Sequence, residues 1–185
     1  MKKWVVMLLV FLVSGCAVWQ PTNGLYNGAG YTVDLPKGWM ATKDPKSLNI
    51  TRDGLPLQQV NVYIIDITKL EKENEKILSK SMLPQELAER VLDRMRSNKS
   101  VSQFTVVENV PAQIGGKEGF RVVYTFRQDK VRYREIYYGM LQGETYYRIS
   151  YSAPVRYYFD KDVAVFEEIV KSFKLDEKAG AVAVK

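Results

Sequence analysis

The chain has 185 residues, with 27 basic and 21 acidic side chains and a formal net charge of +6. It contains no histidine and a single cysteine, Cys16. These absences exclude Ser-His-Asp catalysis, histidine metal sites, internal disulfides and cysteine zinc sites, and we expect no metal and no cofactor. The basic excess is mild and lacks a concentrated stripe, so we also expect no nucleic-acid partner.

The first segment has the pattern of an export signal. Lys2 and Lys3 precede a run of ten apolar residues that ends at Val13, and two small residues lead into Cys16. A membrane-spanning helix needs about 20 apolar residues, twice the length of this run. An ordinary secretory peptide would have the same charge and length, but it needs no cysteine after the small residues.

Residues 13–16 resemble the lipobox of bacterial lipoproteins, in which one aliphatic and two small residues precede an obligatory cysteine. The resemblance implies cleavage between Gly15 and Cys16, and palmitate-type acylation of Cys16. Several acyl chains hold a protein durably on a membrane surface. By the same resemblance, Ala17 after the cysteine favours the outer membrane, on its periplasmic face, in a cell with two membranes. We therefore expect an exported, lipid-anchored protein of the cell envelope.

The composition divides the chain into four parts. Residues 1–15 are the expected signal peptide, and 16–29 lack periodicity and are rich in Gly and Asn, which is typical of a flexible tether. Residues 30–175 suit one domain with a full core. The small and charged residues 176–185 are expected to form a disordered tail.

The first half of the domain shows strand patterns followed by one clear helix. Alternation and β-branched residues predict strands over 30–35, 39–42, 48–51 and 57–67. The charged run from Thr68 to Lys80 indicates a solvated excursion whose start fits a capping box. Pro84 suits the first turn of the helix that follows, which extends to about Lys99.

The second half predicts a meander of four strands and a closing helix. The strands are expected over 103–114, 119–127, 131–142 and 145–153, joined by tight turns at Gly115-Gly116, Asp129-Lys130 and Gly143-Glu144. Asp160 is a candidate cap for a helix that ends at Lys171. The meander strands carry apolar side chains on both faces, so both faces need cover. The pattern thus predicts an antiparallel sheet between helices.

The stretch Tyr31-Thr32-Val33-Asp34-Leu35-Pro36-Lys37-Gly38-Trp39 resembles the entry strand of PsbP-like domains. The middle helix, the tyrosine-rich meander and the closing helix ending Lys171-Ser172-Phe173-Lys174 match that family in order, over about residues 30–175. The resemblance implies an α/β/α sandwich and a role in binding or assembly. It transfers no active site, because one fold hosts many functions.

Four arginines on the meander are the candidate site: Arg121, Arg127, Arg132 and Arg134. If Asp129-Lys130 is a two-residue turn, Arg127 faces Arg132. Opposed like charges are mildly destabilising, and a bound anion would offset them. With Arg148 and Arg156 nearby, the arginines could bind phosphate or carboxylate groups of a partner. The alternative is that neighbouring carboxylates already pair them.

Three functions remain open on the sequence. The first is a lipid-anchored, non-enzymatic binding or assembly module that recognises an envelope protein or an anionic envelope component. The alternative is a lipid-anchored carrier of a small ligand in a crevice between sheet and helix. A carboxylate-based hydrolase is third, because nothing in the sequence brings two acids together. A large apolar pocket would favour the carrier, a patch of Arg and Tyr the module, and converging buried carboxylates the hydrolase.

Overall fold

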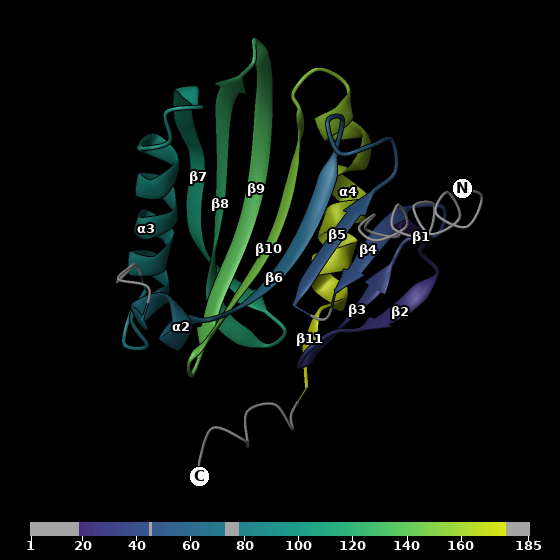
Figure 1. Cartoon of the computed structure of the whole chain (residues 1–185). Coiled ribbons are helices and arrows are strands. Elements are labelled where there is room, and N and C mark those ends of the chain that lie inside the picture. The colour runs from purple at the N-terminus through teal and green to yellow at the C-terminus, as the bar shows by residue number, and fades with distance from the viewer. Residues whose placement is uncertain (1–18, 45, 73–77, 177–185) are drawn as a thin grey trace, which may run out of the picture.

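The computed structural model describes residues 19–44, 46–72 and 78–176, which form two antiparallel sheets and three helices (Figure 1). The large sheet has the strand order β1-β4-β5-β6-β10-β9-β8-β7, and the small sheet has the order β11-β3-β2. The large sheet consists of β1 (Trp19–Pro21), β4 (Met40–Asp44), β5 (Ser47–Thr51), β6 (Gln59–Asp66), β7 (Ser102–Ile114), β8 (Lys117–Gln128), β9 (Val131–Gln142) and β10 (Thr145–Pro154). The small sheet consists of β2 (Gly24–Asn27), β3 (Tyr31–Leu35) and β11 (Lys174–Leu175). The helices are α2 (Ile67–Lys72), α3 (Pro84–Arg96) and α4 (Tyr158–Ser172).

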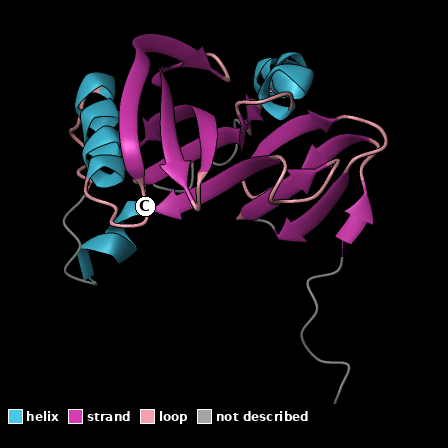
Figure 2. Ribbon diagram, turned by 90° about the horizontal axis from the view of Figure 1, so that it is seen from above, coloured by secondary structure: helices cyan, strands magenta, loops and turns pink. Residues whose placement is uncertain are grey.

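The helices α3 and α4 lie on opposite sides of the bent large sheet (Figure 2). Helix α3 contacts β7, β8 and β9, and α4 contacts β10 and the small sheet. Phe120, Val122 and Tyr124 pack in the cluster under α3. Val123 and Ile136 pack in the separate cluster that includes α4. Each face of the meander thus has its own buried apolar cluster, one that includes α4 and one under α3. This confirms the predicted sheet between helices.

The N-terminal part of the described chain differs from the expected tether. Residues 19–21 and 24–27 lie in the segment 16–29 but form β1 and β2. Trp19 pairs opposite Thr42 at the edge of the large sheet, and Tyr26 pairs opposite Val33 in the small sheet. These strands are short and depend on partners distant in sequence, so no local periodicity indicates them. The predicted strand 30–35 is present as β3, which begins one residue later and lies in the small sheet.

Two helix starts also differ from the sequence pattern. Helix α4 begins at Tyr158 with Tyr157 at the cap position, which places Asp160 inside the first turn. Helix α2 begins at Ile67, and Asp66 Oδ1 accepts hydrogen bonds from the backbone N and the hydroxyl of Thr68 at 3.0 and 2.7 Å. A side chain two residues earlier than the expected cap, Thr68, therefore accepts from a free backbone amide in the first turn of α2.

Several expectations fall outside the described residues. They concern the signal segment 1–15, the acylation of Cys16, residues 73–77 of the charged run, and the tail from 177 onward. Within the described ranges, the helices are too short or too polar to cross a bilayer.

Candidate functional site: a basic end of the sandwich

The hairpin between β8 and β9 has the register that the sequence predicts. Asp129 and Lys130 form its two-residue turn, with φ angles of +47° and +69°. Arg127 therefore pairs opposite Arg132, and Thr125 opposite Arg134. Because directly paired residues share one face of a sheet, three arginines project on the same side near the hairpin tip.

The three arginines have neutral neighbours. Arg127 Nε donates to the carbonyl of Lys130 at 3.2 Å, and Arg132 Nη2 donates to Thr125 Oγ1 at 3.4 Å. The guanidinium of Arg134 lies 4.9 Å from the centre of the Phe159 ring, and its buried Nε has no hydrogen-bond partner in the described structure. No described carboxylate lies within 4.0 Å of any of the three. None of the three forms an ion pair among the described residues.

Arg121 is separate from this group. It lies six residues along β8 from Arg127, a distance of about 20 Å at the usual rise of a strand. It forms ion pairs with Glu108 and with Glu167, the latter at 3.2 Å, and its Nε donates to the hydroxyl of Tyr138 at 3.0 Å. Burial alone would lower its pKa, but the hydrogen bonds of the two glutamates hold the pKa of Arg121 above its ordinary value. This arginine of β8 therefore links the neighbouring strand β7 and the helix α4.

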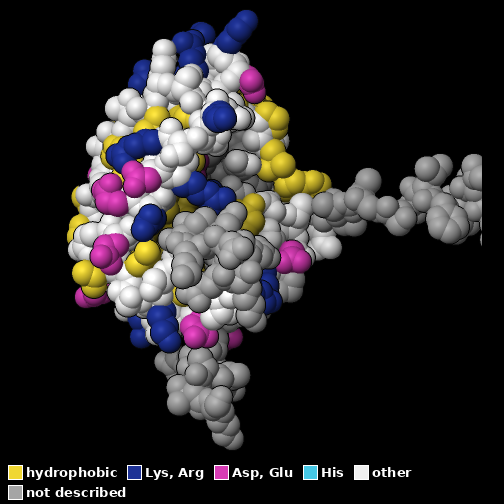
Figure 3. All heavy atoms as spheres, turned by 60° about the vertical axis from the view of Figure 1, so that its left-hand side comes forward, with side chains coloured by type: hydrophobic (Ala, Val, Ile, Leu, Met, Phe, Trp, Pro, Cys, Tyr) yellow, Lys and Arg dark blue, Asp and Glu magenta, His cyan; other side chains and the backbone are white. Residues whose placement is uncertain are grey.

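Of the two further arginines named from the sequence, Arg156 joins the group and Arg148 does not. The amide of Val155 donates to the carbonyl of Arg132 at 2.9 Å, which holds the β10–α4 loop beside the hairpin. Arg156 is exposed and, like Lys130, has no ion pair among the described residues. We call the following set the basic end: Arg127, Lys130, Arg132, Arg134 and Arg156. Lys and Arg side chains gather at the corresponding upper end of the molecule in Figure 3.

Arg148 lies on the α3 side of the sheet, in a buried polar cluster. Its Nη2 is 3.4 Å from Glu135 Oε1, and its guanidinium lies 4.9 Å from the Tyr137 ring and 5.4 Å from the Tyr63 ring. Burial raises the pKa of Glu135, and the charge of Arg148 opposes that rise. For Arg148, the alternative that a neighbouring carboxylate already pairs the arginine is therefore correct.

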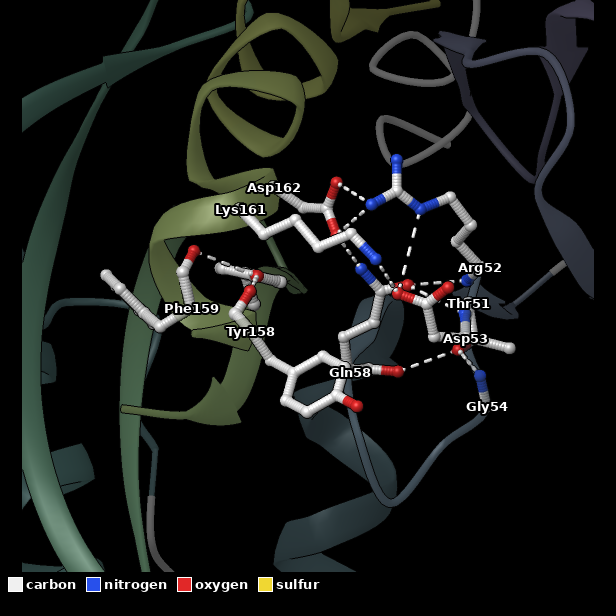
Figure 4. Close-up of polar contacts among 10 residues, drawn as sticks. Thr51, Arg52, Asp53, Gly54, Gln58, Tyr158, Phe159, Lys161 and Asp162 are labelled. Carbon is white, nitrogen blue, oxygen red and sulfur yellow. Dashed lines mark hydrogen bonds and ion pairs between the residues drawn. The ribbon is translucent and has the colours of Figure 1, made fainter. Parts of the chain in front are cut away.

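A polar clamp joins the β5–β6 loop to the start of α4 (Figure 4). Asp162 is only 1% exposed, its Oδ1 lies 2.8 Å from Arg52 Nη2, and it accepts a hydrogen bond from Gln58 Nε2. Next to it, Lys161 Nζ lies 2.5 Å from Asp53 Oδ2. Burial raises the pKa of Asp162, whereas the hydrogen bond from Lys161 lowers the pKa of Asp53. The clamp holds the loop 52–58 beside the basic end.

This clamp is absent from the predictions made from the sequence, although the sequence contains one signal for it. The buried stripe of α4 includes Phe159, Phe166 and Ile169, and Asp162 occupies a position on the same stripe. An acid at a core position of a helix needs a partner, because burial of an unpaired carboxylate is costly. The partners Arg52 and Gln58 are more than one hundred residues away, so the sequence does not identify them.

The opposite end of the molecule has a groove of about 840 Å³ between hairpin turns. Gly115-Gly116 forms one of these turns, as predicted, because Ile114 pairs opposite Lys117. The groove also contacts Asp66, Glu144 and Tyr147. Apart from Tyr147 it is lined mainly by turns and charged side chains, whereas the alternative of a ligand carrier placed its site in a crevice between sheet and helix.

The two buried acids of the described chain do not converge. Glu135 lies on the α3 side with Arg148, and Asp162 lies on the α4 side with Arg52. Within the described residues, no three side chains of the metal-binding types come together. The basic end, in contrast, gathers five basic side chains that have no ion pair among the described residues.

Comparisons with known proteins agree with this architecture. A search of curated protein sequences found no match. Among solved structures, the chain is similar to cyanobacterial PsbP (CyanoP) from Synechocystis sp. PCC 6803, with 15% identity, a TM-score of 0.57, and 88% of this chain and 95% of the other covered. It is also similar to the Saccharomyces cerevisiae Ran-binding protein Mog1p, with 10% identity, a TM-score of 0.56, and coverage of 86% and 98%. The family model of PsbP matches residues 25–175, so this chain belongs to the PsbP family.

Proposed function

We propose that this protein is a lipid-anchored, non-enzymatic binding module of the bacterial cell envelope, and that its basic end recognises an anionic partner. The observation that carries the proposal is the set of five basic side chains without a carboxylate within 4.0 Å in the described structure. Guanidinium groups bind carboxylates and phosphates with paired hydrogen bonds, which gives such a surface both affinity and orientation.

The surroundings of the basic end support a role in recognition. A two-residue turn sets the hairpin, and the clamp around Asp162 sets the neighbouring loop. Side chains on a rigid frame lose less entropy when they bind a partner. Mog1p is named as a Ran-binding protein, so a chain with this fold can carry a protein-binding surface.

The lipobox-like residues supply the anchor of this proposal. Only residues 17 and 18 separate Cys16 from Trp19 in β1, and three residue steps span at most about 10 Å. An acylated Cys16 would therefore hold the β1 edge of the sandwich close to the lipid. In a cell with two membranes, we place the protein at the periplasmic face of the outer membrane.

We expect that Cys16→Ser abolishes the anchor. The variant should lose incorporation of labelled palmitate and should move from the membrane fraction to the soluble fraction, or accumulate as an unprocessed precursor. Cell fractionation with metabolic labelling measures both effects, and Ser14→Ala serves as a matched control that keeps the cysteine. Equal palmitate incorporation in parent and Cys16→Ser would contradict the proposed anchor.

We expect that charge removal at the basic end abolishes partner capture. The variant Arg127→Gln/Arg132→Gln/Arg156→Gln should lower cross-linked partner recovery from intact envelopes at least about tenfold, because charge-assisted hydrogen bonds contribute roughly 1.5–3 kcal/mol each. The control Arg90→Gln/Lys117→Gln/Lys174→Gln removes the same charge from exposed positions elsewhere. Recovery equal to that of the parent, at equal protein level, would refute the role of the basic end.

A further inference from the structure

We infer that the basic end docks onto an anionic lipid headgroup layer, with exposed apolar side chains of its loops entering the interface. The inference rests on the proposed function and specifies the chemistry of the anionic partner. It depends on three features of this end: exposed apolar side chains, backbone strain and an excess of positive charge.

Apolar side chains project from three separate segments at this end. Tyr157 is 65% exposed, Leu55 is 42% exposed and Val131 is 40% exposed. Tyr157 lies in the β10–α4 loop, Leu55 in the β5–β6 loop and Val131 beside the turn of the β8–β9 hairpin. The scattered exposure of single apolar residues is ordinary, but here three accompany the unpaired cations of the basic end.

Direct contacts show that these segments are neighbours. The hydroxyl of Tyr133, which follows the hairpin turn, lies 3.4 Å from the carbonyl of Pro56. Lys161 in the first turn of α4 reaches Asp53 at 2.5 Å (Figure 4). With the bond from Val155 to the hairpin, these contacts place the three segments side by side at one end.

Backbone strain is concentrated at the same end. The four described non-glycine residues with positive φ are Gln103, Asp129, Lys130 and Tyr157, at +50°, +47°, +69° and +74°. Gln103 belongs here because its neighbour Ser102 pairs opposite Arg127. A two-residue hairpin turn requires positive φ at Asp129 and Lys130. At Gln103 and Tyr157 no such turn requires it, and strain of that kind persists only where the surrounding structure enforces it and clusters at functional sites.

Tyr157 has the most unusual conformation of the four. Its φ of +74° and ψ of −56°, with a 3.0 Å hydrogen bond from Tyr158 N to the carbonyl of Arg156, define the rare and strained form of the γ-turn. A glycine would adopt this conformation at lower cost. The chain instead has a large aromatic side chain there, and it is presented to solvent 5.4 Å from the ammonium of Lys161.

The charge of this end is complementary to an anionic layer. The segments 52–58, 127–134 and 155–161 contain seven basic and three acidic side chains. Asp162 pairs with Arg52 of the first segment, so the excess at this end is three positive charges. The acids of the three segments are Asp53, which is paired with Lys161, and the exposed Asp129 and Asp160. Basic residues near an anionic membrane surface each add to binding, and tyrosine favours the headgroup region because its ring is apolar and its hydroxyl is polar.

The shape favours a lipid layer over a folded protein. The apolar side chains stand on separate turns, and the large groove of the molecule lies at the opposite end. A protein partner would need a matching cavity for each projecting side chain, whereas a fluid headgroup layer accommodates them without one. An acidic protein is therefore the alternative that the experiment must exclude.

The test uses the mature chain 16–185 with Cys16→Ser, which contains every described residue and has no acyl group. Cosedimentation is measured with vesicles of phosphatidylcholine alone and of phosphatidylcholine mixed equally with phosphatidylglycerol. We expect binding to the mixed vesicles only. Tyr157→Ser/Leu55→Ser should lower the partition coefficient about tenfold, because partial burial of two such side chains is lost. The control Leu25→Ser/Leu83→Ser, at leucines 63% and 61% exposed, should bind like the parent.

Tyr157→Gly separates docking from folding. It removes the ring but suits a positive φ, so we expect weaker vesicle binding with a melting temperature no lower than that of the parent. Absence of binding to mixed vesicles, or equal loss in the leucine control, would overturn lipid docking. If lipid docking is overturned but the envelope cross-links still require Arg127 and Arg132, the partner is an acidic protein. The proposed function then stands. The proposed function itself would be refuted if Arg127→Gln/Arg132→Gln/Arg156→Gln kept both its vesicle binding and its envelope cross-links.

Discussion

Arg148→Met is expected to lower the free energy of unfolding by about 2–3 kcal/mol at neutral pH, because it leaves a buried carboxylate without its cation. Glu135 is 7% exposed, and Arg148 provides its ion pair at 3.4 Å. The expected loss of unfolding free energy is smaller than for the removal of one partner of a fully buried ion pair, because the side chain of Arg148 is 32% exposed and solvent screens the pair. Urea unfolding of parent and variant measures the difference.

The deficit of Arg148→Met should depend on pH. Burial already raises the pKa of Glu135 in the folded state, and loss of the opposing Arg148 charge raises it further. The folded variant then binds the proton more tightly than the unfolded chain, so its stability falls as pH rises between the unfolded and folded pKa values. The deficit should be smallest below the ordinary glutamate pKa of about 4.3.

A double variant completes this test. In Arg148→Met/Glu135→Gln no charge is left unpaired, and we expect recovery of at least about half of the loss. A deficit that is the same at all pH values, with no recovery in the double variant, would show that the lost packing of Arg148 on Tyr137 and Tyr63 determines the effect.

Asp162→Ala is expected to lower the free energy of unfolding by about 2–4 kcal/mol, since it removes the acceptor for Arg52 and for Gln58. For a chain of this size, the melting temperature should fall by roughly 5–15 °C, which calorimetry measures. The control is Asp160→Ala, which removes an exposed acid from the same turn of α4. Equal melting temperatures for the two variants would show that the clamp does not stabilise the fold.

Local pattern alone predicted much of the large sheet. The expected strand 131–142 has the bounds of β9, and the helix that starts at Pro84 is α3. Apolar residues on both faces of the meander indicated two covering helices. The turn at Asp129-Lys130 gave the register that pairs Arg127 with Arg132. These features follow from periodicity and turn chemistry within about twenty residues, so the sequence contains them directly.

Other features depend on residues that only the fold brings together. β1 and β2 have weak patterns of their own and form because β4 and β3 supply partners for their backbone. The sequence grouped Arg121 with the other arginines of the meander, whereas in the structure it lies six residues from Arg127 along β8 and is paired with Glu108 and Glu167. A strand pattern gives the face on which a side chain lies, but it does not give the charges that approach from other elements.

The sequence by itself determined the balance of strands and helices, the faces of the meander, the family resemblance and the lack of histidine chemistry. The tertiary structure decided which arginines are paired and which remain available at the basic end. It also decided that Asp162 in α4 binds the loop of Arg52. The physical reason is that periodicity acts over neighbouring residues, whereas ion pairing, burial and strain depend on segments far apart in the chain.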